Sequence, residues 1–187
     1  FKLKTALLML LAICIQVSAQ NSAWKPASFE VINKYKTFKT TKYAHVFSGS
    51  KHNIVKLAPE LEGLTGIELP LESYKNGTNA PLKLKFKESV QILIGVFQEK
   101  DNKEFFQFTD DNPNAKLILK NAVTITGLPP VDIYAFSCLE ATYSFKNKGL
   151  FIVLGVVKAS EKLESRNAEL PDGKLWNPTF IVEGFSD

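Results

Sequence analysis

Two short apolar runs constrain the fold of this chain more than any other feature of its sequence. Residues 90–98 read VQILIGVFQ, and residues 150–157 read LFIVLGVV. Both runs are rich in Val, Ile and Phe and are bounded by polar or turn residues, which favours strands over helices. Because side chains alternate between the two faces of a strand, each run is apolar on both faces. We therefore expect two central strands of a sheet that is covered on both sides.

The segment before the first run has a different pattern. In residues 82–87 leucine or phenylalanine alternates with lysine (LKLKFK), as in an antiparallel strand with one face on the core and one in water. Further short strands are expected at residues 29–32, 43–47, 54–57, 64–69, 105–108, 116–120, 122–126, 131–138 and 141–146. Roughly ten strands at this spacing predict an all-β fold, a two-sheet antiparallel β-sandwich that is jelly-roll-like.

The C-terminal part of the chain lacks this strand pattern. Residues 160–170 are compatible with one or two helical turns, and residues 176–185 are rich in large apolar groups. We expect this irregular segment to pack on one face of the sandwich, because exposed aromatic surface promotes aggregation. Gly95 and Gly155 lie at equivalent places in the central runs. We expect both to lie under residues 176–185, which need the missing side chains in order to approach the backbone. The alternative is that this face and the segment together contact another protein.

The N-terminus has the pattern of a secretory signal peptide. Two lysines precede an uncharged apolar run, and Val17-Ser18-Ala19 offers small residues for cleavage. We expect removal of residues 1–19, a mature chain that begins at Gln20 without a membrane span, and a location in the periplasm or at the cell surface. Lipidation of Cys14 is an alternative, although a bulky residue precedes this cysteine where a small one is expected.

The mature chain has the size of a single domain, residues 20–187, which leaves 168 residues for one core. Cys138 is its only cysteine, so an internal disulfide is excluded. Loss of two lysines lowers the net charge from +4 to +2. Arg166 is the only arginine, and arginine is the residue that binds phosphate and guanine through two parallel hydrogen bonds. Nucleic acid is therefore not an expected partner.

No strong catalytic or metal motif is present, which leaves an enzymatic role without support in the sequence. His45 and His52 flank a Ser-Gly-Ser turn and would meet in a hairpin, but two imidazoles alone hold zinc poorly. Two unrelated surface histidines are the simpler interpretation. Cys138 lies within an expected strand, where a buried structural thiol is favoured over a reactive one.

One loop offers oxygen donors for calcium. Asp110, Asp111, Asn112 and Asn114 lie close together in the sequence, and calcium takes 6 to 8 oxygen ligands. The same residues also form simple turns by bonding to their own backbone. No other cofactor is expected, and the scattered acidic residues define no glycosidase acid and base pair.

Two aromatic residues are candidates for sugar binding. Trp176 is followed by Asn177, and Tyr74 lies near Asn76 in a turn cluster. A pyranose ring can stack on an exposed aromatic face while neighbouring amides bind its hydroxyls. For both aromatic residues, packing in the core is the alternative.

Four segments carry a resemblance to a known kind of module. They are residues 64–74 (LTGIELPLESY), 82–97 (LKLKFKESVQILIGVF), 126–136 (TGLPPVDIYAF) and 149–157 (GLFIVLGVV). Together they resemble the jelly-roll, galactose-binding-like β-sandwich accessory modules of exported Bacteroidetes-type polysaccharide-degrading proteins. The resemblance lies in strand sequence and transfers no catalytic residue. It implies a non-catalytic, glycan-binding role, with two alternatives: a structural protein that docks on a larger exported partner, and a small polysaccharide hydrolase or lyase.

Overall fold

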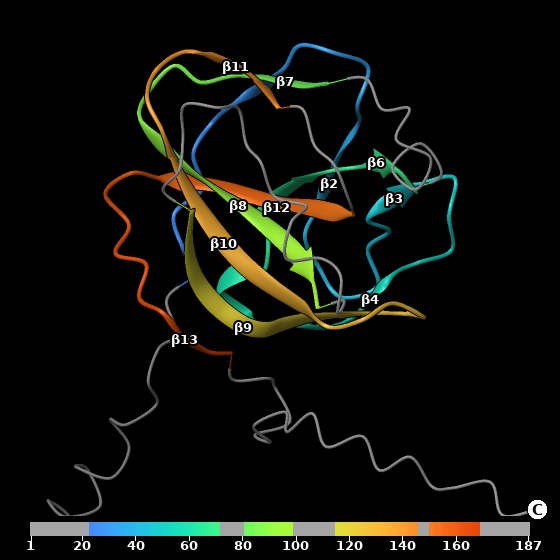
Figure 1. Ribbon diagram of the computed structural model, residues 1–187. Coiled ribbons are helices and arrows are strands. Elements are labelled where there is room, and N and C mark those ends of the chain that lie inside the picture. The colour runs from blue at the N-terminus through green and yellow to red at the C-terminus, as the bar shows by residue number, and fades with distance from the viewer. Residues whose placement is uncertain (1–22, 72–80, 99–114, 146–149, 169–187) are drawn as a thin grey trace, which may run out of the picture.

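The computed structural model describes residues 23–71, 81–98, 115–145 and 150–168. Within these ranges the chain forms thirteen strands and one short 3-10 turn, η1 (Pro59–Leu61) (Figure 1). All strand pairs among them are antiparallel except β13–β9 and β3–β6. The strands are β1 (Glu30–Val31), β2 (Thr37–Lys39), β3 (Phe47–Ser48), β4 (Ile54–Leu57), β5 (Thr65–Ile67), β6 (Leu69–Pro70), β7 (Leu82–Lys85), β8 (Val90–Phe97), β9 (Ala115–Ile125), β10 (Val131–Cys138), β11 (Thr142–Phe145), β12 (Phe151–Lys158) and β13 (Arg166–Asn167). The prediction of an all-β sandwich is confirmed.

The two apolar runs lie at the centre of an eight-stranded sheet. Its order is β13-β9-β10-β8-β12-β5-β2, and β4 pairs with β9 beside this path. Strand β8 lies between β10 and β12, and seven consecutive residues of β12, from Phe151 to Val157, are buried. The predicted central strands are therefore confirmed.

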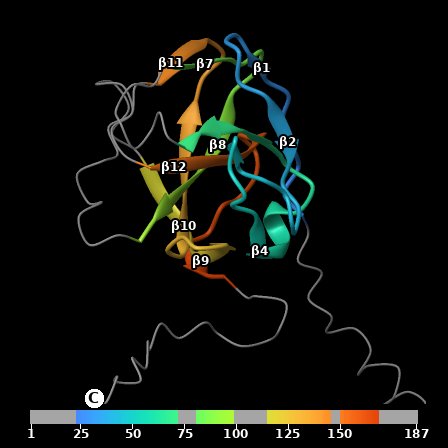
Figure 2. The same cartoon turned by 90° about the vertical axis from the view of Figure 1, so that its right-hand side faces the viewer.

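A bent pair of strands connects this large sheet to a three-stranded sheet, β1-β7-β11. Strand β7 continues into β8, and β10 continues into β11. On one side of the bend β8 pairs with β10, and on the other side β7 pairs with β11. At the bend, the Phe86 N–H donates to the Ala141 carbonyl at 2.9 Å. Figure 2 shows β1, β7 and β11 together at one end of the molecule, beyond the large sheet. In β7 the leucines are buried and the lysines exposed, as the alternation predicts.

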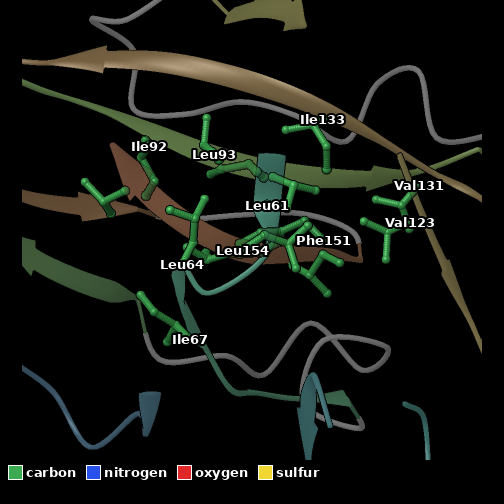
Figure 3. Close-up of a cluster of buried hydrophobic side chains, with 14 of the residues drawn as sticks. Leu61, Leu64, Ile67, Ile92, Leu93, Val123, Val131, Ile133, Phe151 and Leu154 are labelled. Atoms are coloured by element: carbon green, nitrogen blue, oxygen red, sulfur yellow. The ribbon is translucent and has the colours of Figure 1, made fainter. Parts of the chain in front are cut away.

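The core fills the space between these sheets, and Figure 3 shows part of it, with Leu61 and Leu64 close to the side chains of β8 and β12. Leu64 packs against the backbone of β12: a Cβ added at Gly155 would lie 2.7 Å from its Cδ1 and 2.8 Å from its Cβ. A Cβ at Gly95 would lie 2.6 Å from Ile152 Cγ1 and from Val131 Cγ1. Core side chains thus approach both glycines closely, whereas residues 176–185, which were expected to cover them, lie outside the described ranges.

A β-bulge accompanies Gly155. The pairing of β12 with β8 shifts register between Val153 and Gly155, which places Leu154 at the irregularity. The buried Thr40 hydroxyl donates to the Leu154 carbonyl at 2.6 Å. Thr40 is itself fixed, because its N–H donates to the Leu64 carbonyl and its carbonyl accepts from Gly63. A hydrogen bond from a side chain thus replaces regular ladder pairing in the core.

Three local predictions are corrected. Residues 116–120 and 122–126 were expected as two strands, but they belong to the single strand β9. Residues 160–168 contain no helical turn, and β13 forms there because it pairs in parallel with β9. Strands β3 and β6 make a separate two-stranded sheet, so the molecule has more than the two sheets expected. Residues 169–187, expected to cover one face, and residues 105–108, expected as a strand, lie outside the described ranges.

Candidate functional site

The seven residues singled out for ligand and metal binding lie outside the described residues. They are Trp176, Asn177, Tyr74, Asn76, Asp110, Asp111 and Asn112. Sugar stacking on the two aromatics and calcium binding in the loop therefore stay predictions. In the part of the chain that the structure describes, no group of three His, Cys, Asp or Glu residues could hold a metal ion. None of these described residues forms a helix long and apolar enough to cross a membrane.

The two histidines do lie in one hairpin. His45 pairs with Asn53 across it, and His52 Nδ1 donates to the Thr126 carbonyl at 2.7 Å. The His52 ring also meets the Phe47 ring edge to face, at a centroid distance of 6.5 Å. His52 therefore positions the turn after β9.

Cys138 is buried at the end of β10, with 2% of its surface exposed. Burial raises the pKa of this thiol to about 12. A protonated, inaccessible thiol is a poor nucleophile, so the structure agrees with a structural role.

A second β-bulge lies in β9 and centres on Asn121. Val131 pairs with Val123 and Ile133 pairs with Leu119, so residues 120–122 lie opposite Asp132 alone. Asn121 takes a left-handed backbone, with φ of 52°, which asparagine tolerates better than most residues. The bulge coincides with a change of neighbour on the outer side of β9, from β13 to β4.

The carbonyl groups on both sides of the bulge are hydrogen-bonded. The Lys120 carbonyl accepts from Ala168 at 3.0 Å, and the Ala122 carbonyl accepts from Ala58 at 2.8 Å. Nearby, the buried Glu60 of η1 forms an ion pair with Arg166 of β13. Ala58 directly precedes η1, and Ala168 directly follows β13. The ion pair between η1 and β13 therefore links the two segments that donate hydrogen bonds to the bulge.

The bulge brings three polar side chains together, and we name them the bulge cluster: Gln98, Asn121 and Asp132. Gln98 Nε2 donates to Asn121 Oδ1 at 2.8 Å and to Asp132 Oδ1 at 2.7 Å. The Asn121 backbone N–H donates to the same Asp132 oxygen at 2.8 Å. Gln98 is exposed and the other two residues are half-buried. A carboxylate and two amides are thus joined by hydrogen bonds at the surface of the large sheet.

The remaining polar atoms of this cluster point to its chemistry. Asp132 Oδ2, Gln98 Oε1 and Asn121 Nδ2 make no hydrogen bond to any other described residue. Among the described residues, these atoms leave two acceptors and one donor available in the cluster. Tyr134 lies two residues beyond Asp132 in β10, and its pKa is raised by burial and by the negative charge of Asp132. A carboxylate with two neighbouring amides is suited to binding polar groups such as hydroxyls.

The bulge cluster was not predicted from the sequence. Gln98, Asn121 and Asp132 are separated by tens of residues, and each one alone resembles an ordinary strand-end or turn residue. One sequence signal for the bulge was present. Asn121 is a polar residue between two apolar stretches, and these stretches belong to one strand, β9, which is the pattern of a strand interrupted by a bulge.

No family model and no curated protein matches this sequence. Among solved structures, it is similar to a GH138 enzyme targeting pectin rhamnogalacturonan II, with a TM-score of 0.67 and 24% identity over 88% of this chain. The match covers 20% of that enzyme, so this chain spans about a fifth of its length. A β-glucuronidase from glycoside hydrolase family 2 has a TM-score of 0.43 and 10% identity, over 72% of this chain and 15% of that one. The first likeness shows a shared fold, and the second is too weak to support an argument.

Proposed function

We propose that this chain is a secreted, non-catalytic β-sandwich module that binds glycan through the bulge cluster. The observation that carries the proposal is the hydrogen-bonded arrangement of Gln98, Asn121 and Asp132 on a bulge braced from two sides. Bulges of this kind commonly direct side chains at binding sites. The fold shared with part of a glycoside hydrolase supports the same conclusion.

Sugar recognition requires the groups that this cluster contains. A sugar hydroxyl donates one hydrogen bond and accepts others, so carboxylate and amide groups bind it in pairs. Glycosidases generally use two carboxyl groups at a set separation, whereas the cluster holds one, Asp132. Binding therefore fits this cluster better than hydrolysis.

Pectic glycan is the first ligand class to test, because the similar enzyme targets pectin rhamnogalacturonan II. Tyr74 and Trp176, with Asn76 and Asn177, remain the proposed aromatic and amide contacts outside the described residues. The proposed calcium residues Asp110, Asp111 and Asn112 likewise lie outside the described residues.

The test is calorimetric titration of the protein with rhamnogalacturonan II fragments and a panel of other soluble polysaccharides. Gln98→Ala and Asn121→Gly should each lower the affinity about fivefold, because each removes a hydrogen bond worth about 1 kcal/mol. Asn121→Gly keeps the left-handed backbone of the bulge, so folding should be preserved. Gln91→Ala is the matched control, since Gln91 lies at the opposite end of β8 and donates to the backbone carbonyls of Lys158, Ala159 and Glu161.

Two results would overturn this proposal. One is a wild-type protein that binds no glycan of the panel. The other is glycan binding that Gln98→Ala and Asn121→Gly leave unchanged, which would move the binding site elsewhere on the molecule.

Docking on a larger exported protein is the second candidate. Leu139 is 72% exposed at the bend between β10 and β11, and Ile32 is 48% exposed just after β1. Exposed apolar side chains near the small sheet would favour contact with a protein partner. Co-purification of a partner that Leu139→Asp and Ile32→Asp release, while glycan binding persists, would support this second role.

A further inference from the structure

A four-residue turn before β3 has an unusual residue at its third position. The Ala44 N–H donates to the Thr41 carbonyl at 3.1 Å, which closes a β-turn. Tyr43 has φ of 72°, whereas Lys42 is not among the residues with positive φ. A β-turn in which only the third residue is left-handed is type II, and that position normally holds glycine or asparagine.

Tyrosine is poorly suited to this backbone. Within the described residues, every other position with positive φ holds glycine or asparagine: Gly49, Gly63, Gly127 and Asn121. A bulky side chain in this region is strained, because its Cβ approaches the backbone. Backbone strain of this kind is found mainly at ligand-binding and other functional sites.

Burial does not compensate for the strain. The Tyr43 side chain is 65% exposed, so it contributes little to the core. The backbone is held instead, because the Tyr43 N–H donates to the Ile54 carbonyl at 2.7 Å and the Ile54 N–H donates to the Ala44 carbonyl at 3.0 Å. The start of β4 therefore fixes the turn that presents this ring to solvent.

A contact with Lys42 also orients the Tyr43 ring. Lys42 Nζ lies 5.3 Å from the centroid of the Tyr43 ring, within the range of a cation–π contact. The ammonium group occupies one side of the ring and supplies hydrogen-bond donors next to it. The turn thus combines a rigidly based aromatic face with a polar donor.

We propose that Tyr43 is a stacking platform for a pyranose ring, which makes the Thr41–Ala44 turn a second sugar subsite. This inference rests on the proposed glycan-binding function and adds a contact outside the bulge cluster. The C–H face of the sugar packs on the phenol ring and excludes water, while Lys42 donates to a sugar hydroxyl. The subsite is distinct from the bulge cluster. Tyr43 is held by the Ile54 carbonyl, and Ile54 pairs with Ile125, which lies four residues beyond Asn121 in β9.

The test compares Tyr43→Gly and Tyr43→Phe in the full chain, with rhamnogalacturonan II fragments and neutral β-1,4-galactan fragments as the probes. Tyr43→Gly should lower the affinity roughly tenfold. Its melting temperature should stay unchanged or rise by about 2–4 °C, because glycine relieves the left-handed strain. Tyr43→Phe keeps the ring and should bind within about twofold of wild type. Leu139→Ala, which shortens another exposed apolar side chain, should change nothing.

The possible outcomes separate this subsite from the proposed function. If Gln98→Ala weakens binding and Tyr43→Gly does not, the module binds glycan and the subsite inference is wrong. If Tyr43→Gly lowers the melting temperature by several degrees, the ring is structural and the inference is likewise overturned. If the wild-type protein binds neither probe, the subsite inference is rejected, and the wider polysaccharide panel decides the proposed function separately.

Discussion

Two residues with a left-handed backbone, Tyr43 and Asn121, contribute to the two proposed sugar subsites. Asn121 turns its side chain toward Gln98 because the bulge in β9 changes the direction of the strand. Tyr43 projects into solvent because the turn before β3 fixes its backbone. In both places hydrogen bonds from distant segments maintain a conformation that the local sequence does not favour.

A sequence contains little information about such residues. Tyrosine gives no local signal of the positive φ at residue 43, whereas Asn121 gives a weak one, because asparagine tolerates this backbone better than most residues. Cys138 was easier to interpret, because a thiol inside an apolar strand is ordinarily buried. The Glu60–Arg166 ion pair was not predictable, since η1 and β13 are separated by about a hundred residues.

Cys138 should make stability fall at alkaline pH. Its pKa is raised from 9.0 to about 12 in the folded protein. Below pH 9 the thiol is protonated in both states, and its full contribution to stability is present. As pH rises toward about 12, only the unfolded chain releases this proton, so stability is lost. Urea unfolding at several pH values should show a smaller alkaline loss for Cys138→Ala than for wild type, and equal losses would contradict burial of the thiol.

The Glu60–Arg166 ion pair gives a second prediction at this scale. Within the described residues, neither Glu60 oxygen has a regular hydrogen bond, so the ion pair with Arg166 compensates the buried charge. Arg166→Met should destabilise the fold by about 3 kcal/mol, because it leaves a buried carboxylate unpaired. The double variant Glu60→Gln with Arg166→Met should recover part of this loss. Lys162→Met, an exposed lysine in the same segment, is the control, and an Arg166→Met protein as stable as this control would refute the role of the pair.

At the scale of elements, the apolar pattern and the Gly and Pro residues between the apolar runs were sufficient to predict several strands. β4 and β10 have the predicted bounds, Ile54–Leu57 and Val131–Cys138. The two predicted strands in β9 proved to be one, because the polar Asn121 marks a bulge inside a strand. Strands β2 and β13 escaped prediction, since pairing with β5 and β9 creates them from short stretches without strong alternation.

The contact between Leu64 and β12 can be tested by a double-mutant cycle. Gly155→Ala should destabilise the protein by about 1–3 kcal/mol, because the new methyl group would meet Leu64 Cβ at 2.8 Å. Leu64→Ala leaves a cavity and costs about 2–5 kcal/mol. Since the first change partly fills the space that the second one opens, the double variant should be more stable than the sum of the two losses predicts. Additive losses in chemical denaturation would show that Leu64 is not the neighbour that requires glycine.

At the scale of the whole molecule, the all-β sandwich is shared with part of a much longer glycoside hydrolase. A shared fold does not determine a function, so the functional argument depends on particular side chains. Here these are the bulge cluster and Tyr43, both outside the apolar core that specifies the fold. Export, the mature start at Gln20 and a location in the periplasm or at the cell surface stay predictions, which the mass of protein recovered from the expressing cell would test.

Mapping of amide NMR resonances during titration with rhamnogalacturonan II fragments tests the central claim most directly, because it reports both binding and its place. The glycan-binding account predicts shifts at Gln98, Asn121 and Asp132, with a second group of shifts at Tyr43 and its turn. Resonances of the small sheet, such as those of Lys83 and Lys85, should stay in place. Shifts confined to the small sheet, or no shifts with these fragments and with the wider polysaccharide panel, would contradict the account.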